Sequence, residues 1–210
     1  MDKEFFIDFD GTITTTDTCW AMVQAYARAG WEEINRQWEN KEISTQECAQ
    51  RTFELFDATP GELQKLVEGI DIDPFFIDFW HWCRKRDYPV RILSDGYDFN
   101  IRIILNKYRL PIPYYANRLI YDRGFKIECP YLNQTCGNCG TCKTALMQKL
   151  KHAHSRTIYI GDGYSDTCPA RHADLVYAKG TLYEYCVNQG LPVLEYQNFH
   201  DILSSLESGN

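Results

Sequence analysis

Short apolar runs followed at once by polar turn residues recur along the chain and predict buried β-strands. The first is residues 5–7, and from residue 88 onward such runs alternate with helix-like segments. The strands expected in this later part are residues 89–93, 114–117, 156–161, 174–178 and 192–195. The helices expected there are residues 97–107, 143–152, 165–171, 181–189 and 198–207. Such alternation is typical of a parallel sheet with helices on both faces, so the sequence predicts a doubly wound, Rossmann-like α/β fold.

The stretch between the first two strands has a different pattern, with apolar residues three or four positions apart. This spacing predicts helices over residues 17–29, 31–39, 44–56 and 60–69. Ser44 and Glu47 have the spacing of a capping box, and Pro60 suits the first turn of a helix.

This helical stretch interrupts the α/β pattern, and we therefore expect two domains. Residues 16–73 would form a helical cap inserted into a core domain of residues 1–15 and 74–210. Within the later part, residues 118–128 predict a β-hairpin with its turn at residues 122–124.

Polar residues suited to catalysis stand at the ends of the predicted strands. Asp8 and Asp10 follow the first strand, Ser94 follows the strand at residues 89–93 and Asp162 follows the strand at residues 156–161, while Lys143 opens a helix. The carboxyl ends of parallel strands meet at one edge of a sheet, so we expect these side chains to lie together. Taken singly, each also has an ordinary structural explanation, as part of a turn, as a helix cap or as a solvated lysine.

The order of these motifs resembles that of haloacid-dehalogenase-superfamily phosphatases, which carry an Asp-x-Asp pair, a strand-end Ser or Thr, a Lys and a paired acidic motif. The four motifs span residues 8–166. A helical cap between the first two is similar to that of phosphoserine phosphatases. The start at Asp8, the stretch Ser94–Phe99 and the cysteine-rich run before Lys143 are similar to the methionine-salvage phosphatases. Related phosphocholine and phosphoethanolamine phosphatases also carry cysteines before the lysine.

The resemblance implies a reaction through an aspartyl-phosphate. Asp8 would attack phosphorus, and Asp10 would protonate the leaving alkoxide and later deprotonate water. Mg²⁺ prefers hard oxygen ligands, which Asp8, Asp162 and the main-chain carbonyl of Asp10 would provide. Asp166 would orient metal-bound water or Lys143.

The non-transferred phosphoryl oxygens need donors and positive charge. Ser94 and Lys143 would supply them, together with the main-chain amides of Gly96 and Phe9. In the cap, Asp17 and Arg51 stand where phosphoserine phosphatases grip their substrate, although Asp17 replaces the usual Glu. Each is equally explained as a charge that stabilises a cap helix.

Nine cysteines are many for one chain of this length. Four of them cluster before Lys143: Cys129, Cys136, Cys139 and Cys142. Four thiolates with short gaps suit a structural Zn²⁺, although three so close together would be crowded; disulfides or reduced thiols are the alternatives. We expect the other five to be small core residues.

The net charge of −7 argues against nucleic acid as a partner. The chain has no apolar run near the ~18 residues that a membrane span needs, and its N-terminus lacks the apolar region of a signal peptide. We therefore expect a cytoplasmic protein without membrane contact; the oligomeric state is not predicted.

The predicted function is Mg²⁺-dependent hydrolysis of a small phosphomonoester metabolite, at the methionine-salvage phosphatase step or on a phosphoserine-like substrate. The alternatives are a phosphotransferase with the same intermediate and a non-catalytic metal-binding module.

Overall fold

The computed structural model describes residues 2–135 and 139–208 and divides the chain into two compact units. The first unit comprises Met1–Thr15, Ile72–Leu93 and Lys143–Asn210. The second comprises Thr16–Asp71 and Ser94–Cys142. Residues 94–142 therefore group with the helical stretch, whereas the predicted domains place them in the core.

The first unit is built on parallel strands in the order β2-β1-β5-β6-β7. Their bounds are β1 Lys3–Ile7, β2 Val90–Tyr97, β5 Arg156–Gly161, β6 Leu175–Ala178 and β7 Val193–Glu195, with β2 continuing into the second unit. Ile7, the last residue of β1, pairs with Ile92 on one side and Ile160 on the other. This sheet confirms the predicted doubly wound α/β fold.

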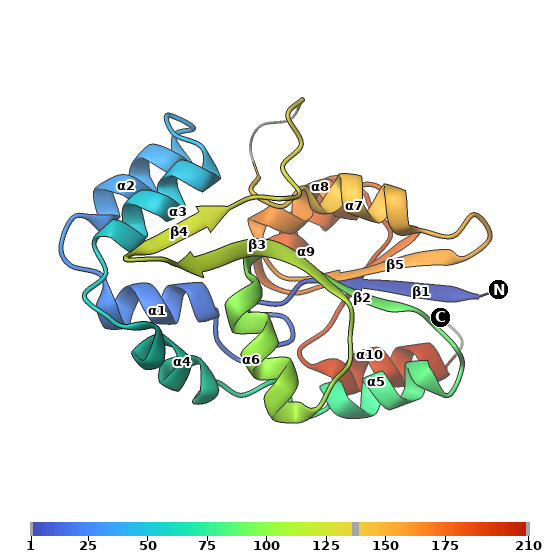
Figure 1. Cartoon of the computed structure of the whole chain (residues 1–210). Helices are drawn as coiled ribbons and strands as arrows, with labels where there is room; N and C mark the ends of the chain where they lie inside the picture. Colours follow the sequence, from blue (N-terminus) through green and yellow to red (C-terminus); the bar gives the residue numbers. More distant parts are fainter. Residues whose placement is uncertain (1, 136–138, 209–210) are drawn as a thin grey trace. The chain divides into compact units, whose positions relative to one another are not determined.

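Helices α5 (Phe76–Arg84) and α10 (Phe199–Glu207) cover one face of this sheet, and α7 (Lys143–Leu150) and α8 (Thr167–Ala170) lie on the other (Figure 1). Helix α9 (Gly180–Asn188) joins β6 to β7. Aromatic side chains fill the layer between β1, α5 and α10: Phe5 meets Phe79 edge-on at 5.2 Å, and Phe79 lies 5.1 Å from Phe199. Such buried rings provide much of the apolar area that stabilises the unit.

Glu4 on β1 is a fully buried acid with partners on three other segments. Its Oε2 lies 3.2 Å from Arg91 Nη1 on β2 and 3.2 Å from Nδ1 of His152, which follows α7. Its Oε1 accepts a hydrogen bond from the His152 amide at 2.9 Å and one from Thr157 Oγ1 at 3.4 Å. A buried carboxylate needs such partners because burial removes its hydration.

The second unit contains the four helices expected before residue 70, which the structure confirms. They are α1 Thr18–Tyr26, α2 Trp31–Glu39, α3 Thr45–Glu54 and α4 Pro60–Glu68. Ser44 caps α3 by accepting the Glu47 amide at 3.1 Å. At α4, Thr59 and Glu62 form a full capping box, and Pro60 stands in the first turn.

The same unit contains the predicted hairpin. It consists of β3 (Tyr114–Tyr121) and β4 (Phe125–Glu128), paired antiparallel around the turn in which the Asp122 amide donates to the Gly124 carbonyl at 3.0 Å. Residues 114–117, predicted as a separate strand, are instead the first half of β3.

Side chains explain why residues 94–142 group with the helices. The Gln50 amide of α3 donates to the Phe125 carbonyl and accepts from the Ile127 amide, each at 3.0 Å, so it satisfies the outer edge of β4. Helix α6 (Asp98–Tyr108) is bonded to the end of α4, because Lys107 Nζ donates to the Glu68 carbonyl at 3.0 Å. Across the residues described, no helix has the length and apolar character needed to cross a membrane.

Candidate active site

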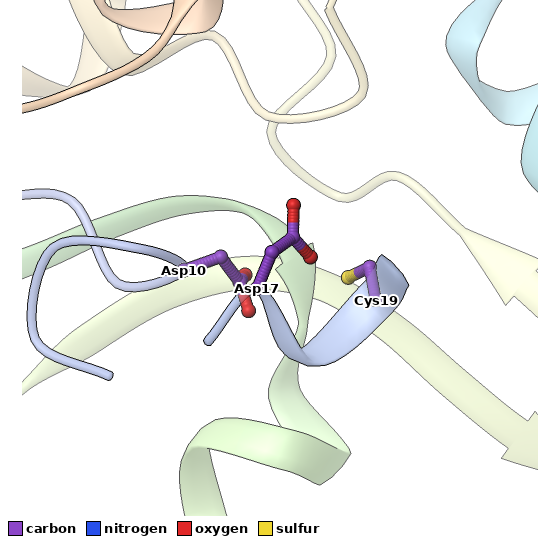
Figure 2. A group of neighbouring side chains, drawn as sticks. All are labelled: Asp10, Asp17 and Cys19. Carbon is purple, nitrogen blue, oxygen red and sulfur yellow. The ribbon is translucent and has the colours of Figure 1, made fainter. Parts of the chain in front are cut away.

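The loop after β1 carries the first two aspartates. Asp8 is buried, and its Oδ1 accepts the Phe9 amide at 2.7 Å. Asp10, half-buried, stands further along this loop (Figure 2). Gly11 has φ +73°, and a Cβ there would lie 2.6 Å from Asp162 Oδ2. Only glycine therefore permits both this turn and the close approach of Asp162.

Lys143, the first residue of α7, lies between the carboxylates of Asp8 and Asp166. Among the described residues, it is the only lysine that forms an ion pair with either of them. Its Nζ lies 2.7 Å from Asp8 Oδ1 and 2.7 Å from Asp166 Oδ1, and it donates to Ser165 Oγ at 3.0 Å. The side chain is only 2% exposed. The alternative explanation of Lys143 as a solvated surface lysine is therefore excluded.

The loop after β5 carries the other two carboxylates. Asp162 Oδ1 accepts a hydrogen bond from Thr12 Oγ1 at 2.7 Å. Asp166 ends the short helical turn η1 (Tyr164–Asp166) and is fully buried. Its Oδ2 accepts the amides of Asp162 and Gly163, each at 3.1 Å.

The three carboxylates carry more negative charge than Lys143 balances. Asp8, Asp162 and Asp166 each offer an oxygen within 4.8 Å of the other two. Burial, then the charge of Asp166, raises the pKa of Asp8 well above its ordinary value despite Lys143. Burial also raises the pKa of Asp162, against the hydrogen bond from Thr12. Burial alone would lower the pKa of Lys143, but Asp166 and Asp8 raise it.

This surplus of charge fits a hard divalent cation, because such ions bind buried carboxylate oxygens and neutralise them. Asp8 and Asp162 are the better ligands. Asp166 already accepts from Lys143 and from two main-chain amides, so it is suited to orienting its neighbours. Asp8 and Asp162, two of the Mg²⁺ ligands expected from the sequence, therefore lie together, whereas metal binding by the Asp10 carbonyl stays a prediction.

Ser94 and Gly96, expected to bind phosphate, belong to the second unit. Ser94 is fully buried, and its Oγ accepts the Gly96 amide at 2.9 Å. Their role toward phosphate stays a prediction.

Asp17 and Arg51 also belong to the second unit, and each has a local structural contact. Asp17 is the N-cap of α1 and accepts the Trp20 amide at 2.9 Å; it is labelled beside Cys19 of α1 in Figure 2. Arg51 Nη1 donates to Gln37 Oε1 at 2.9 Å and lies 3.7 Å from Glu47 Oε1. A substrate role for either stays a prediction.

The cysteine cluster gains no support as a zinc site. Cys136 lies outside the described residues, and within those described neither Cys129, Cys139 nor Cys142 joins a group of three or more potential ligands. Cys142 Sγ instead accepts from Asn133 Nδ2 at 3.7 Å. Burial, then the charge of Asp95, raises the pKa of the Cys129 thiol to about 11.

Two polar contacts of the site were not expected from the sequence. Thr12 holds Asp162, and Ser165 accepts from Lys143. The available signal was their place within the two acidic motifs, where a hydroxyl side chain can donate to a carboxylate or accept from an ammonium.

Comparison with known proteins now defines the class. A family described as Putative Phosphatase matches residues 5–185, and the chain belongs to this family. It is an enzyme, a phosphatase.

Among its relatives, a 2-hydroxy-3-keto-5-methylthiopentenyl-1-phosphate phosphatase of Brevibacillus brevis is 32% identical over 209 residues, covering 96% of this chain and 94% of the relative. A protein of the same name from Bacillus pumilus is 31% identical, covering 95% and 89%. Solved structures show the fold: apo phosphoserine phosphatase has a TM-score of 0.72 at 21% identity, covering 97% of this chain and 98% of that one. A substrate-bound phosphoserine phosphatase has a TM-score of 0.73 at 20% identity, covering 98% of each.

Proposed function

We propose that the chain is a Mg²⁺-dependent phosphomonoester hydrolase that forms an aspartyl-phosphate on Asp8. One observation carries the proposal: a buried lysine joins two of three crowded carboxylates directly behind the end of β1. A purely structural cluster would balance its charges, whereas this one keeps a negative surplus that a cation and a substrate can use.

Asp8 is the nucleophile. Lys143 and the Phe9 amide both bond Oδ1, which fixes the plane of the carboxylate, so we assign the attack to Oδ2. Its bond to phosphorus forms as the bond from phosphorus to the leaving oxygen breaks. Asp10 gives its proton to that oxygen, then takes a proton from the water that attacks the aspartyl-phosphate. Inorganic phosphate leaves and Asp8 is restored.

Positive charge is needed while the phosphoryl group moves. When bound by Asp8 and Asp162, Mg²⁺ would neutralise these carboxylates and a phosphoryl oxygen. Lys143 supplies a fixed ammonium at Asp8 and Asp166, and its raised pKa keeps it charged. Ser94 Oγ and the Gly96 amide would hold further phosphoryl oxygens.

The substrate we propose is the one named for the relatives, 2-hydroxy-3-keto-5-methylthiopentenyl-1-phosphate. Two relatives at 31–32% identity, aligned over nearly the whole chain, carry this name. Phosphoserine is the second candidate, because the fold matches phosphoserine phosphatases at TM-scores of 0.72 and 0.73. We place the enzyme in the cytoplasm, where such small metabolites occur.

The test measures phosphate release from both candidates and from an aryl phosphate, with Mg²⁺ and with excess chelator. Intact-mass spectrometry of a quenched reaction should show one added phosphoryl group, located on the peptide that contains Asp8. Asp10→Asn should lower turnover by ~10²–10⁴-fold. The matched control Asp122→Asn changes an exposed hairpin aspartate and should keep full activity. An unlabelled Asp8 during turnover, or full activity in chelator, would contradict the proposal.

Two alternatives have their own measurements. Adding candidate alcohols shows transfer if a new phosphoester forms, and hydrolysis if only phosphate does. A non-catalytic module would release no phosphate from any substrate. For the cysteine cluster, elemental analysis of reduced protein purified without chelator shows whether zinc is present.

A further inference from the structure

Tyr159 on β5 carries a buried hydroxyl that the steps above do not use. Its side chain is fully buried, and its Oη donates to Asp166 Oδ1 at 2.6 Å. The same Oδ1 accepts from Lys143 Nζ at 2.7 Å, and Lys143 in turn contacts Asp8. A continuous chain of polar contacts therefore runs from the phenol to the nucleophile, entirely within the first unit.

The backbone is shaped to let this contact form. Successive residues of a strand alternate between its faces, so Tyr159 and Gly161 share one face of β5. A Cβ on Gly161 would lie 2.5 Å from Asp166 Oδ2 and 3.1 Å from Tyr159 Cε1. The missing side chain leaves the space in which the Asp166 carboxylate lies against the strand.

Both carboxylate oxygens of Asp166 hold parts of the site, so the orientation of this side chain affects both. Oδ1 holds Lys143, while Oδ2 accepts the amides of Asp162 and Gly163. Rotation of the carboxylate would therefore disturb both the ammonium and the loop that presents Asp162. Two donors at Oδ1 resist that rotation better than one. Burial, then the charge of Asp166, raises the pKa of Tyr159, so the phenol stays protonated and remains a donor.

We infer that Tyr159 is a positioning residue for phosphoryl transfer: its hydroxyl fixes Asp166, which orients Lys143 and the loop that carries Asp162. This inference rests on the proposed function. The role differs from space filling, because phenylalanine would fill the same volume without the donor.

The experiment compares the wild type with Tyr159→Phe. Loss of a group that orients a metal ligand typically costs ~10–100-fold in activity or metal affinity, and Tyr159 acts one contact further back, through Asp166. We expect kcat for an aryl phosphate to fall by about tenfold or more, with KM little changed, and Mg²⁺ binding measured by calorimetry to weaken by about tenfold. The binding measurement needs no turnover.

Tyr177→Phe is the matched control. Tyr177 lies on the neighbouring strand β6, is 1% exposed, and has its hydroxyl 3.0 Å from Ser205 Oγ. Like Tyr159→Phe, this substitution removes a hydroxyl from a buried ring. Its kcat and Mg²⁺ affinity should match those of the wild type, and a fall equal to that of Tyr159→Phe would overturn the inference.

A double-mutant cycle tests whether Tyr159 acts through Asp166. In an Asp166→Asn background, adding Tyr159→Phe should leave Mg²⁺ affinity unchanged. A second loss of affinity as large as the first would show that the phenol acts independently and would overturn the inference.

The proposed function and this inference are contradicted by different results. A wild type that releases no phosphate contradicts the proposed function, whereas an active wild type matched by Tyr159→Phe in kcat and Mg²⁺ affinity contradicts this inference alone.

Discussion

Strand β1 of the first unit has a buried acid near each end, and the two acids differ in how far neighbouring positive groups balance their charge. Glu4, near the start, has a full guanidinium partner in Arg91 and two hydrogen bonds from His152 and Thr157. Asp8, just past the end, shares Lys143 with Asp166 and also lies close to Asp162. One cluster is balanced, and the other keeps a surplus of negative charge.

This difference in charge balance indicates which end of the sheet is functional. A balanced buried cluster gains stability from completed hydrogen bonds and has nothing left to offer a ligand. An unbalanced one costs stability until a cation arrives, and such perturbed groups are typical of catalytic sites. Four variants or conditions test this contrast, ordered from the largest expected effect.

Asp8→Asn should separate activity from stability most clearly. Removing a catalytic nucleophile costs roughly 10⁴- to 10⁶-fold in turnover. The amide also removes one of three crowded charges, so without metal the variant should unfold at equal or higher urea concentration than the wild type. Steady-state kinetics and urea titration measure the two effects. A variant that turns over at near-normal rates would contradict the role of Asp8.

Lys143→Met should damage both properties. Loss of a fixed donor at a developing negative charge costs ~10²–10³-fold in kcat. Stability without metal should also fall, because the buried carboxylates of Asp8 and Asp166 then lack their ammonium partner. Lys149→Met, on the same helix but in its last turn, is the control and should change neither quantity. Unaltered kcat in Lys143→Met would mean that the lysine serves only the fold.

Mg²⁺ should stabilise the folded chain. Ligand at about 100 times its Kd adds ~2.7 kcal/mol to the free energy of unfolding. The gain, measured by thermal unfolding with and without Mg²⁺, should vanish in Asp162→Asn and persist in Glu4→Gln. Equal stabilisation of all three proteins would place the ion away from this cluster.

Glu4→Gln should affect stability alone. The amide keeps the shape but leaves Arg91 without its carboxylate, which costs about 1.5–3 kcal/mol for hydrogen bonds to charged groups. The urea midpoint should fall while kcat and KM stay near the wild-type values. A large loss of kcat at unchanged stability would show that the balanced cluster also serves catalysis.

The sequence predicted the parts of this molecule that follow from strand order. Asp8 and Asp162 meet because parallel strands bring their carboxyl ends to one edge, and the apolar runs reveal those strands. The helices before residue 70 were predicted because their caps and periodicity are local.

What the sequence did not predict depends on side chains that meet across long distances in the chain. Tyr159 stands in an apolar run and gives no sign that its hydroxyl meets Asp166. The grouping of residues 94–142 with the helical stretch depends on Gln50 bonding the backbone of β4, which no periodicity indicates. Glu4 acquires its partners from residues 91 and 152, far along the chain.

The position of β1 has a consequence for how the chain acquires its structure. Phe5 pairs with Val90 on one side and with Ile158 on the other, so both neighbours of β1 are synthesised long after it. Until then its apolar residues have no sheet to join, and the closure of such long loops slows folding. The nascent chain therefore cannot complete its catalytic centre before Asp166 has emerged from the ribosome. During synthesis, Phe5, Phe6 and Ile7 form an unpaired apolar segment of the kind that chaperones bind.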